Sequence, residues 1–241
     1  MEIIFAILGG LLAVAIPLLI IGGIIYLILK ARTGTSIKFS YRVTLRVYFY
    51  IVLLVSIGLA GMGGVSTLLK VGFGEIVDRE FSYGSVYEEH RWSQERKIAR
   101  EKAEQSGEYV DETVDDWDNN RSLPQKLDRA VKTSLINGLS LTLIGGFLFL
   151  VHLFGRRWVE AQDERSDLLR RLYLLAGLAI FAVVTIVSLA AGIPETLRYA
   201  LLDSNPGEES PGEPLSLAIV ILPIWLFFLV ATIRNIRPSK T

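Results

Sequence analysis

The chain has 241 residues, of which 51% are hydrophobic, and its formal net charge is zero because 25 basic residues balance 25 acidic ones. The hydrophobic residues are collected in long blocks, which excludes an ordinary soluble domain and indicates a polytopic membrane protein. The balanced charge argues against nucleic acid as a partner. The sequence contains no cysteine, which excludes disulfides, thiolate metal sites and cysteine nucleophiles.

Five apolar segments are long enough to cross a bilayer as helices, namely residues 3–29, 47–69, 134–154, 172–192 and 215–233. The segments that connect them alternate in charge. Residues 30–46 contain basic but no acidic residues, whereas the loop 70–132 is net negative. Because basic loops remain in the cytoplasm, the pattern predicts an amino terminus outside and a carboxyl terminus inside. The predicted fold is therefore an all-α integral membrane protein with five transmembrane helices.

Two short motifs recur along the chain, which suggests an internal repeat. The first pair is Gly22-Gly23 and Gly145-Gly146, and the second pair is Arg46-Val47-Tyr48 and Arg171-Leu172-Tyr173. The repeat predicts two similar helical hairpins, followed by the fifth helix. The alternative is a coincidence of apolar composition.

The hairpins divide the chain into four segments. Residues 1–74 form the first hairpin, 75–132 an extracytoplasmic charged insert, and 133–203 the second hairpin; 204–241 hold an acidic loop, the fifth span and a basic tail. Gly192 is expected to end the fourth span and Pro194 to begin a short interfacial helix. The alternative is that these residues lengthen a tilted span.

The insert has two parts. Residues 85–105 alternate acidic and basic side chains and predict a solvated helix, on which Tyr83, Val86, Tyr87 and Trp92 offer a surface for a partner or for the membrane. Residues 108–118 are strongly acidic, which is compatible with calcium binding or with a mobile loop. An EF-hand is not indicated, because Arg121 stands where that loop needs glycine.

The second hairpin contains a recognisable set of residues: Gly145, Gly146, His152, Arg156, Arg157, Trp158 and the stretch 164–173. With these residues it resembles an uncharacterised family of bacterial multi-span membrane proteins, classed as a domain of unknown function. The resemblance covers residues 121–203 well and 40–78 more loosely. It implies a helical membrane architecture and a bacterial origin, and it implies no activity, because the family has none assigned.

Few polar residues interrupt the spans. Thr133, Asn137 and Ser140 follow each other at helical spacing, so they form a polar stripe that either lines a path or packs against another helix. His152 is the one histidine within a span, and it suits a haem ligand, a proton relay or an interfacial side chain. The small residues Gly58, Ala60, Gly61 and Gly64 indicate close helix packing.

No nucleophile elbow, phosphate loop, zinc signature or nucleotide fingerprint occurs, so neither an enzyme nor a cofactor nor a metal is expected. The sequence favours an accessory, scaffold or assembly subunit of a bacterial cell membrane, in contact with lipid and with a membrane protein or further copies of itself. A small-solute permease using the polar stripe is the alternative. A sensor that uses the acidic insert is the third possibility.

Overall fold

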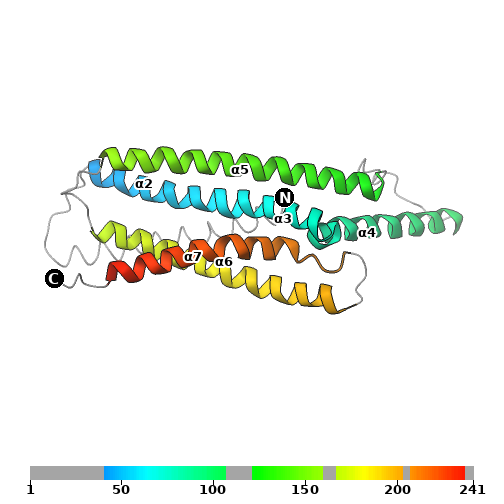
Figure 1. Cartoon of the computed structure of the whole chain (residues 1–241). Coiled ribbons are helices and arrows are strands. Elements are labelled where there is room, and N and C mark those ends of the chain that lie inside the picture. The colour runs from blue at the N-terminus through cyan, green and yellow to red at the C-terminus, as the bar shows by residue number, and fades with distance from the viewer. Residues whose placement is uncertain (1–40, 107–120, 160–166, 203–206, 237–241) are drawn as a thin grey trace. The chain divides into compact units, whose positions relative to one another are not determined.

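The computed structural model describes residues 41–106, 121–159, 167–202 and 207–236. Every regular element in these ranges is helical (Figure 1). The first element is α2 (Tyr41–Gly58), which continues through the π-helix η1 (Leu59–Val65) into α3 (Ser66–Ile76). Four further helices follow, namely α4 (Arg79–Ser106), α5 (Leu123–Val159), α6 (Asp167–Leu201) and α7 (Gly212–Ile236).

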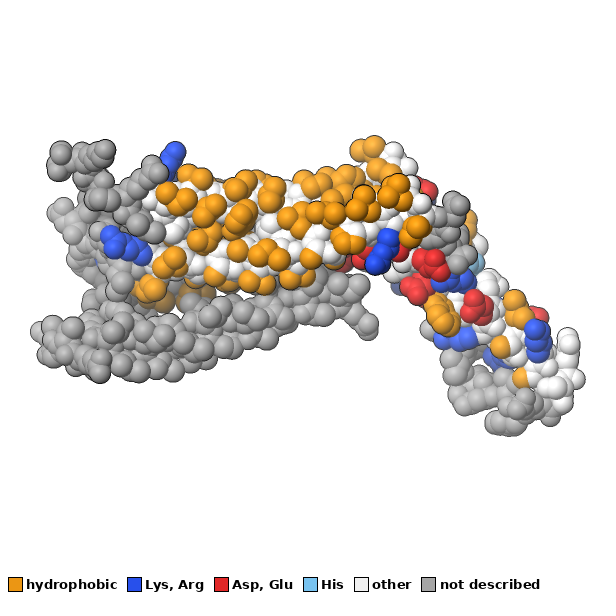
Figure 2. All heavy atoms as spheres, turned by 90° about the horizontal axis from the view of Figure 1, so that it is seen from below, with side chains coloured by type: hydrophobic (Ala, Val, Ile, Leu, Met, Phe, Trp, Pro, Cys, Tyr) orange, Lys and Arg blue, Asp and Glu red, His pale blue; other side chains and the backbone are white. Residues whose placement is uncertain are grey.

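Four stretches within these helices are long and apolar enough to cross a membrane: Thr44–Ile76, Leu123–Trp158, Leu169–Leu201 and Gly212–Asn235. They contain the second to fifth predicted spans, and the all-α class is confirmed for the described residues. The predicted first span, residues 3–29, lies outside the described residues. The charged helix α4 covers the predicted solvated helix at 85–105. Figure 2 shows hydrophobic side chains over the spanning helices and charged ones on and around α4.

The helices are divided between two compact units. The described residues of the first unit are α2, the end of α5 from Ile144, the start of α6 up to Val183, and α7 from Pro223. The second unit holds Leu59–Leu143 and Val184–Leu222, and it therefore includes η1, α3 and α4.

An aromatic cluster forms the core of the first unit. Phe228 of α7 is fully buried, and its ring centroid lies 5.3 Å from that of Phe181 and 5.6 Å from that of Tyr173, both on α6. Tyr173 in turn lies 4.9 Å from Tyr50 of α2. Gly177 of α6 faces the Phe228 ring, where a larger residue would collide with it. Burial of such rings is the main source of packing energy between these helices.

Close approach of main chains is the main feature of the second unit. At Gly64 of η1, a Cβ atom would lie 2.6 Å from the amide nitrogen and 2.8 Å from the Cα of Thr142 on α5. One turn earlier on α5, a Cβ at Gly138 would lie 3.2 Å from the amide nitrogen of Leu68. Glycine is required at Gly64, because no side chain fits between backbones this close, whereas a side chain at Gly138 would be tight against Leu68.

Hydroxyl groups within the spans bond to the preceding turn of their own helix. Thr67 donates to the Gly63 carbonyl at 2.7 Å, Thr142 to Gly138 at 2.7 Å, and Ser188 to Val184 at 2.8 Å. Such bonds satisfy polar side chains where no water is present. They explain how the Thr67 and Ser188 hydroxyls can be buried within the spans.

The predicted helix end at Gly192 is wrong, and so is the separate short helix after Pro194. Helix α6 continues through both residues to Leu201. Gly192 packs against the main chain of Pro214 and Leu215 at the start of α7, and Thr196 donates a 2.5 Å hydrogen bond to the Gly192 carbonyl. These contacts hold the turn in helical form although Pro194 removes one amide donor.

Candidate functional site at the base of helix α4

The base of α4 is its first turns, residues 79–84, which are packed into the second unit. Phe81, Ser82 and Tyr83 are 6%, 1% and 3% exposed, although mixed-charge stretches of this kind are usually solvated. The helix bends at Tyr83, whose φ of −128° and ψ of 31° are not helical. The bend separates the buried base from the exposed remainder of the helix.

Residues 207–211, which precede α7, pack against this base. The Gly84 amide donates to the Ser210 hydroxyl at 3.3 Å, and the Gly207 amide donates to a Glu80 carboxylate oxygen at 3.0 Å. Gly207 has a φ of +93°, which favours glycine, and its Cα faces the backbone of Gly84. Gly212 likewise lies against Ser82. Glycines on both sides therefore allow the two backbones to meet.

A charge pair lies beside the base. The Lys70 ammonium on α3 is 2.5 Å from a Glu213 carboxylate oxygen on α7, and it lies 5.4 Å from the centre of the Tyr83 ring. The two charged side chains are 16% and 31% exposed. The positive charge of this partly buried ammonium is stabilised by two contacts, the carboxylate and the face of the aromatic ring. The pair joins α3 to α7 and fixes the position of Tyr83.

We expect Glu213→Gln to lower the unfolding free energy by about 1–3 kcal/mol, because it leaves the shielded Lys70 ammonium without its carboxylate. The double variant Lys70→Met with Glu213→Gln should recover part of this loss. Denaturation in detergent, followed by circular dichroism, measures both. The matched control is Lys132→Met, which removes the exposed i,i+4 pair with Asp128 and should change stability by less than about 0.5 kcal/mol. Equal losses of stability in Glu213→Gln and in Lys132→Met would contradict the assignment of Lys70–Glu213 as a stabilising pair.

The tyrosines of the base are kept in their neutral form. Burial raises the pKa of Tyr83 above its ordinary value, and the nearby carboxylate of Glu75 adds to this rise. Burial also raises the pKa of Tyr87, with further contributions from Asp78 and Glu80. Both phenols therefore act as neutral packing groups, and neither is suited to act as a base or nucleophile near neutral pH.

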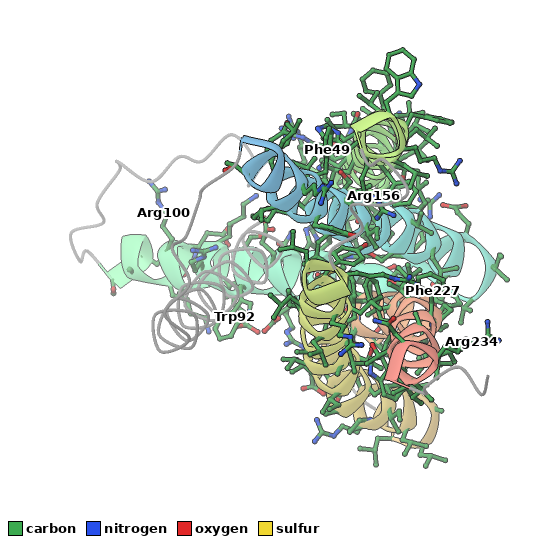
Figure 3. The ribbon with its side chains drawn as sticks, turned by 90° about the vertical axis from the view of Figure 1, so that its left-hand side faces the viewer. Phe49, Trp92, Arg100, Arg156, Phe227 and Arg234 are labelled. Atoms are coloured by element: carbon green, nitrogen blue, oxygen red, sulfur yellow. The ribbon has the colours of Figure 1, made fainter. Side chains whose placement is uncertain are left out.

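Beyond its base, α4 has Ser93 buried but is otherwise exposed or half-buried in its described side chains, and it bears both signs of charge. Trp92 and Ile98 are 54% and 52% exposed, and the Trp92 indole donates to Glu88 of the preceding turn at 3.3 Å. A lateral contact also supports the helix: the Lys126 ammonium of α5, 5% exposed, lies 3.2 Å from Glu89. The exposed part of α4 is thus held at its base and at Glu89. Figure 3 labels Trp92 and Arg100 on it.

A second polar contact occurs in the first unit. His152 Nδ1 lies 2.7 Å from the Leu148 carbonyl oxygen, and His152 Nε2 lies 3.1 Å from the Tyr48 hydroxyl. Because a carbonyl only accepts, Nδ1 donates to Leu148, and in the neutral ring Nε2 accepts from Tyr48. Both ring nitrogens are engaged, so axial ligation of a haem iron would require the loss of the Tyr48 bond.

The predicted polar stripe lies on α5 in the second unit. Thr133 and Ser140 are exposed and Asn137 is half-buried, so the stripe points largely away from the helices described in that unit. Among the predicted packing residues, Gly61 and Gly64 are buried in η1, whereas Gly58 and Ala60 are half-buried. The predicted acidic cluster at 108–118 lies outside the described residues. Within the described ranges, no group of three His, Asp or Glu side chains could hold a metal ion.

Sequence reasoning missed the Lys70–Glu213 pair and the buried base of α4. Both residues lie at the ends of apolar segments, where isolated charges are common. A signal was nevertheless present, because glycines at 84, 207 and 212 flank these positions. Only the fold brings these three glycines close together.

These features define, for the described residues, a helical architecture in which four helices are able to cross a membrane and the charged helix α4 is fixed to the second unit. Residues 117–210 match the model of DUF5671, a domain of unknown function. The match confirms the resemblance to an uncharacterised family over the second hairpin, and it extends from the end of the charged insert to the connection between α6 and α7. No curated protein and no solved structure matches the chain.

Proposed function

We propose that the protein is a non-enzymatic accessory or assembly subunit of a membrane complex, in which α4 contacts the partner. One observation carries this proposal: a 28-residue charged helix is fixed at its base to the helices of the second unit. A helix held in this way presents its outer surface in a defined orientation. Less ordering entropy is then lost when a partner binds.

The character of the exposed part of α4 supports a protein partner. It combines the large side chains Trp92 and Ile98 with alternating acidic and basic residues. Aromatic residues and arginine are enriched at protein interfaces, where a few large side chains supply most of the binding energy. Phe81, Ser82 and Tyr83 of the base are buried, and Glu80 and Gly84 are hydrogen-bonded to Gly207 and Ser210, so the base serves to position the helix.

A crosslinking experiment in the native host tests the proposal. A photoreactive amino acid at Trp92 should crosslink a defined protein in stoichiometric amount, and the same group at Leu143, an exposed residue of α5 within an apolar span, should give lipid adducts. The Trp92→Ala variant should reduce co-purification of that protein about tenfold or more, as expected for an interface hot spot. Unchanged co-purification in Trp92→Ala, with no protein crosslink at Trp92, would contradict the proposal.

We further propose that the protein resides in a bacterial cell membrane with its amino terminus and α4 outside and its carboxyl terminus inside. The support is the segregation of charge, since arginines gather at the helix ends around residues 156–171 while the insert is acidic. Because the chain lacks cysteine, single cysteines can be labelled from outside. We expect labelling at Gln105→Cys and protection at Trp158→Cys, a position that is 95% exposed. The reverse pattern would overturn the orientation.

The permease alternative depends on the polar stripe. Selective solute flux in reconstituted vesicles that disappears in Asn137→Leu would replace the assembly proposal. Asn137 is half-buried, whereas Thr133 and Ser140 are exposed, so the described helices of the second unit do not enclose the stripe as they would the wall of a path. The sensor alternative is tested by calorimetric titration of the full chain with calcium. Absence of calcium binding would contradict this alternative.

A further inference from the structure

Arginine side chains gather at one end of the first unit. Helices α2 and α6 begin at this end, and α5 and α7 finish there (Figure 1). Arg156 and Arg157 lie at the end of α5, Arg170 and Arg171 at the start of α6, and Arg234 in the last turn of α7. The described side chains of this unit, within 44–58, 144–158, 169–183 and 223–235, include no acidic residue. We call Arg156, Arg157, Arg170, Arg171 and Arg234 the arginine cluster.

Aromatic rings fix the centre of this cluster. The guanidinium carbon of Arg156 lies 5.0 Å from the centre of the Tyr50 ring, and Tyr50 stacks at 4.9 Å on Tyr173. Arg170 precedes Tyr173 by three residues, so it lies on the same side of α6 one turn away. Figure 3 shows this end of the helices, with Arg156 and Arg234 labelled. The cation–π contact and the ring pair thus place the arginines of α5 and α6 at the same height along the helix axes.

The cluster meets solvent on one side and apolar side chains on the other. Arg157, Arg170, Arg171 and Arg234 are exposed, and Trp158 is 95% exposed. Within about one turn toward the middle of the helices, Phe154 and Leu172 are 58% and 43% exposed. A tryptophan beside arginines, with exposed apolar residues about one turn further into the helices, is typical of the level of lipid headgroups.

We propose that the arginine cluster binds the headgroup of an anionic phospholipid. Guanidinium groups pair with phosphate oxygens through parallel hydrogen bonds, and arginines at the level of the headgroups attract anionic ones. The exposed Phe154 and Leu172 side chains then contact the acyl chains of the same molecule. A soluble phosphate has no acyl chains to contact Phe154 and Leu172, so the expected ligand is a lipid.

Native mass spectrometry of the full chain tests this proposal. The protein is released from micelles that contain equal amounts of phosphatidylglycerol and phosphatidylcholine, and the retained lipids are counted. We expect about a tenfold preference for phosphatidylglycerol. The double variant Arg157→Gln with Arg171→Gln should lower this preference at least about fivefold, since each arginine near a charged headgroup contributes roughly that factor. The double variant Arg170→Gln with Arg234→Gln should do the same if the first does not fold.

The matched control removes two exposed positive charges from α4, outside the first unit, in Arg96→Gln with Lys102→Gln. This control should keep the wild-type preference. The proposal is overturned if wild type retains both lipids equally, if a folded cluster variant keeps the wild-type preference, or if the control loses as much as the cluster variants. Displacement of phosphatidylglycerol by inorganic phosphate would also overturn it, because the site would then belong to a soluble anion.

Discussion

Gly64→Leu is expected to lower the unfolding free energy by about 3 kcal/mol or more, or to prevent folding in the membrane. A Cβ atom at this position would lie 2.6 Å from the main-chain nitrogen of Thr142, so the collision is with backbone and not with a mobile side-chain end. The Thr142 hydroxyl also faces Gly64 and is held by its hydrogen bond to the Gly138 carbonyl. Relief therefore requires η1 and α5 to move apart.

The measurement is denaturation in mild detergent, followed by circular dichroism and by fluorescence of the four tryptophans. Gly72→Leu is the matched control, because it adds the same side chain to α3 at a position with no atom within 4 Å. It should leave stability unchanged or raise it by up to about 1 kcal/mol, since leucine favours a helix over glycine. Equal effects of the two substitutions would mean that η1 and α5 are not in contact at Gly64.

Gly177→Leu should be the second most damaging change, with a loss of about 2–4 kcal/mol. The added Cβ atom would fall against the Phe228 ring. That ring has no exposed surface and is enclosed by Phe181 and Tyr173, so it has no space into which to turn. The change separates α6 from α7 within the first unit.

Gly146→Leu on α5 is the control for this substitution, because nothing lies within 4 Å of a Cβ atom there. Denaturation curves of the two variants should differ by at least about 2 kcal/mol. A smaller Gly177→Ala change should cost an intermediate amount, because alanine adds only the first colliding atom. If Gly177→Leu were as stable as Gly146→Leu, the contact between α6 and α7 at Phe228 would be wrong.

The two substitutions also separate stability from partner binding. Gly64 lies in the second unit, which carries α4, whereas Gly177 lies in the first. If α4 binds a partner as proposed, a milder Gly64→Ala change should weaken crosslinking at Trp92 because it disturbs the unit to which the base of α4 is fixed. Lipid binding by the arginine cluster is measured independently of this outcome, so failure of one proposal leaves the other testable.

Part of this architecture followed from the sequence because it depends on local composition. The apolar segments beginning near residues 47, 134, 172 and 215 each contain enough consecutive apolar residues to span a bilayer, and the structure places a long helix at each. Alternating charges similarly identified α4. A chain must satisfy its backbone hydrogen bonds within lipid, so length and apolarity alone are strong predictors of a helix.

The predicted end of the helix at Gly192 was wrong because a contact distant in the sequence, and not local composition, determines whether the helix continues there. Glycine and proline are local signals of a helix end, but contact of Gly192 with Pro214 and Leu215 decided the outcome in favour of a continuous α6. No local pattern contains that contact. It depends on how α6 and α7 are rotated and aligned in the second unit.

The sequence by itself determined which segments are apolar, where charge accumulates and which helix is solvated. The tertiary structure decided that Lys70 meets Glu213, 143 residues away, that Tyr83 bends α4 at its base, and that Gly64 meets the main chain of Thr142. These contacts depend on the rotation and register of packed helices, which are fixed by many weak interactions distributed over the unit. A one-residue shift in any of the helices would remove them without changing a single apolar segment.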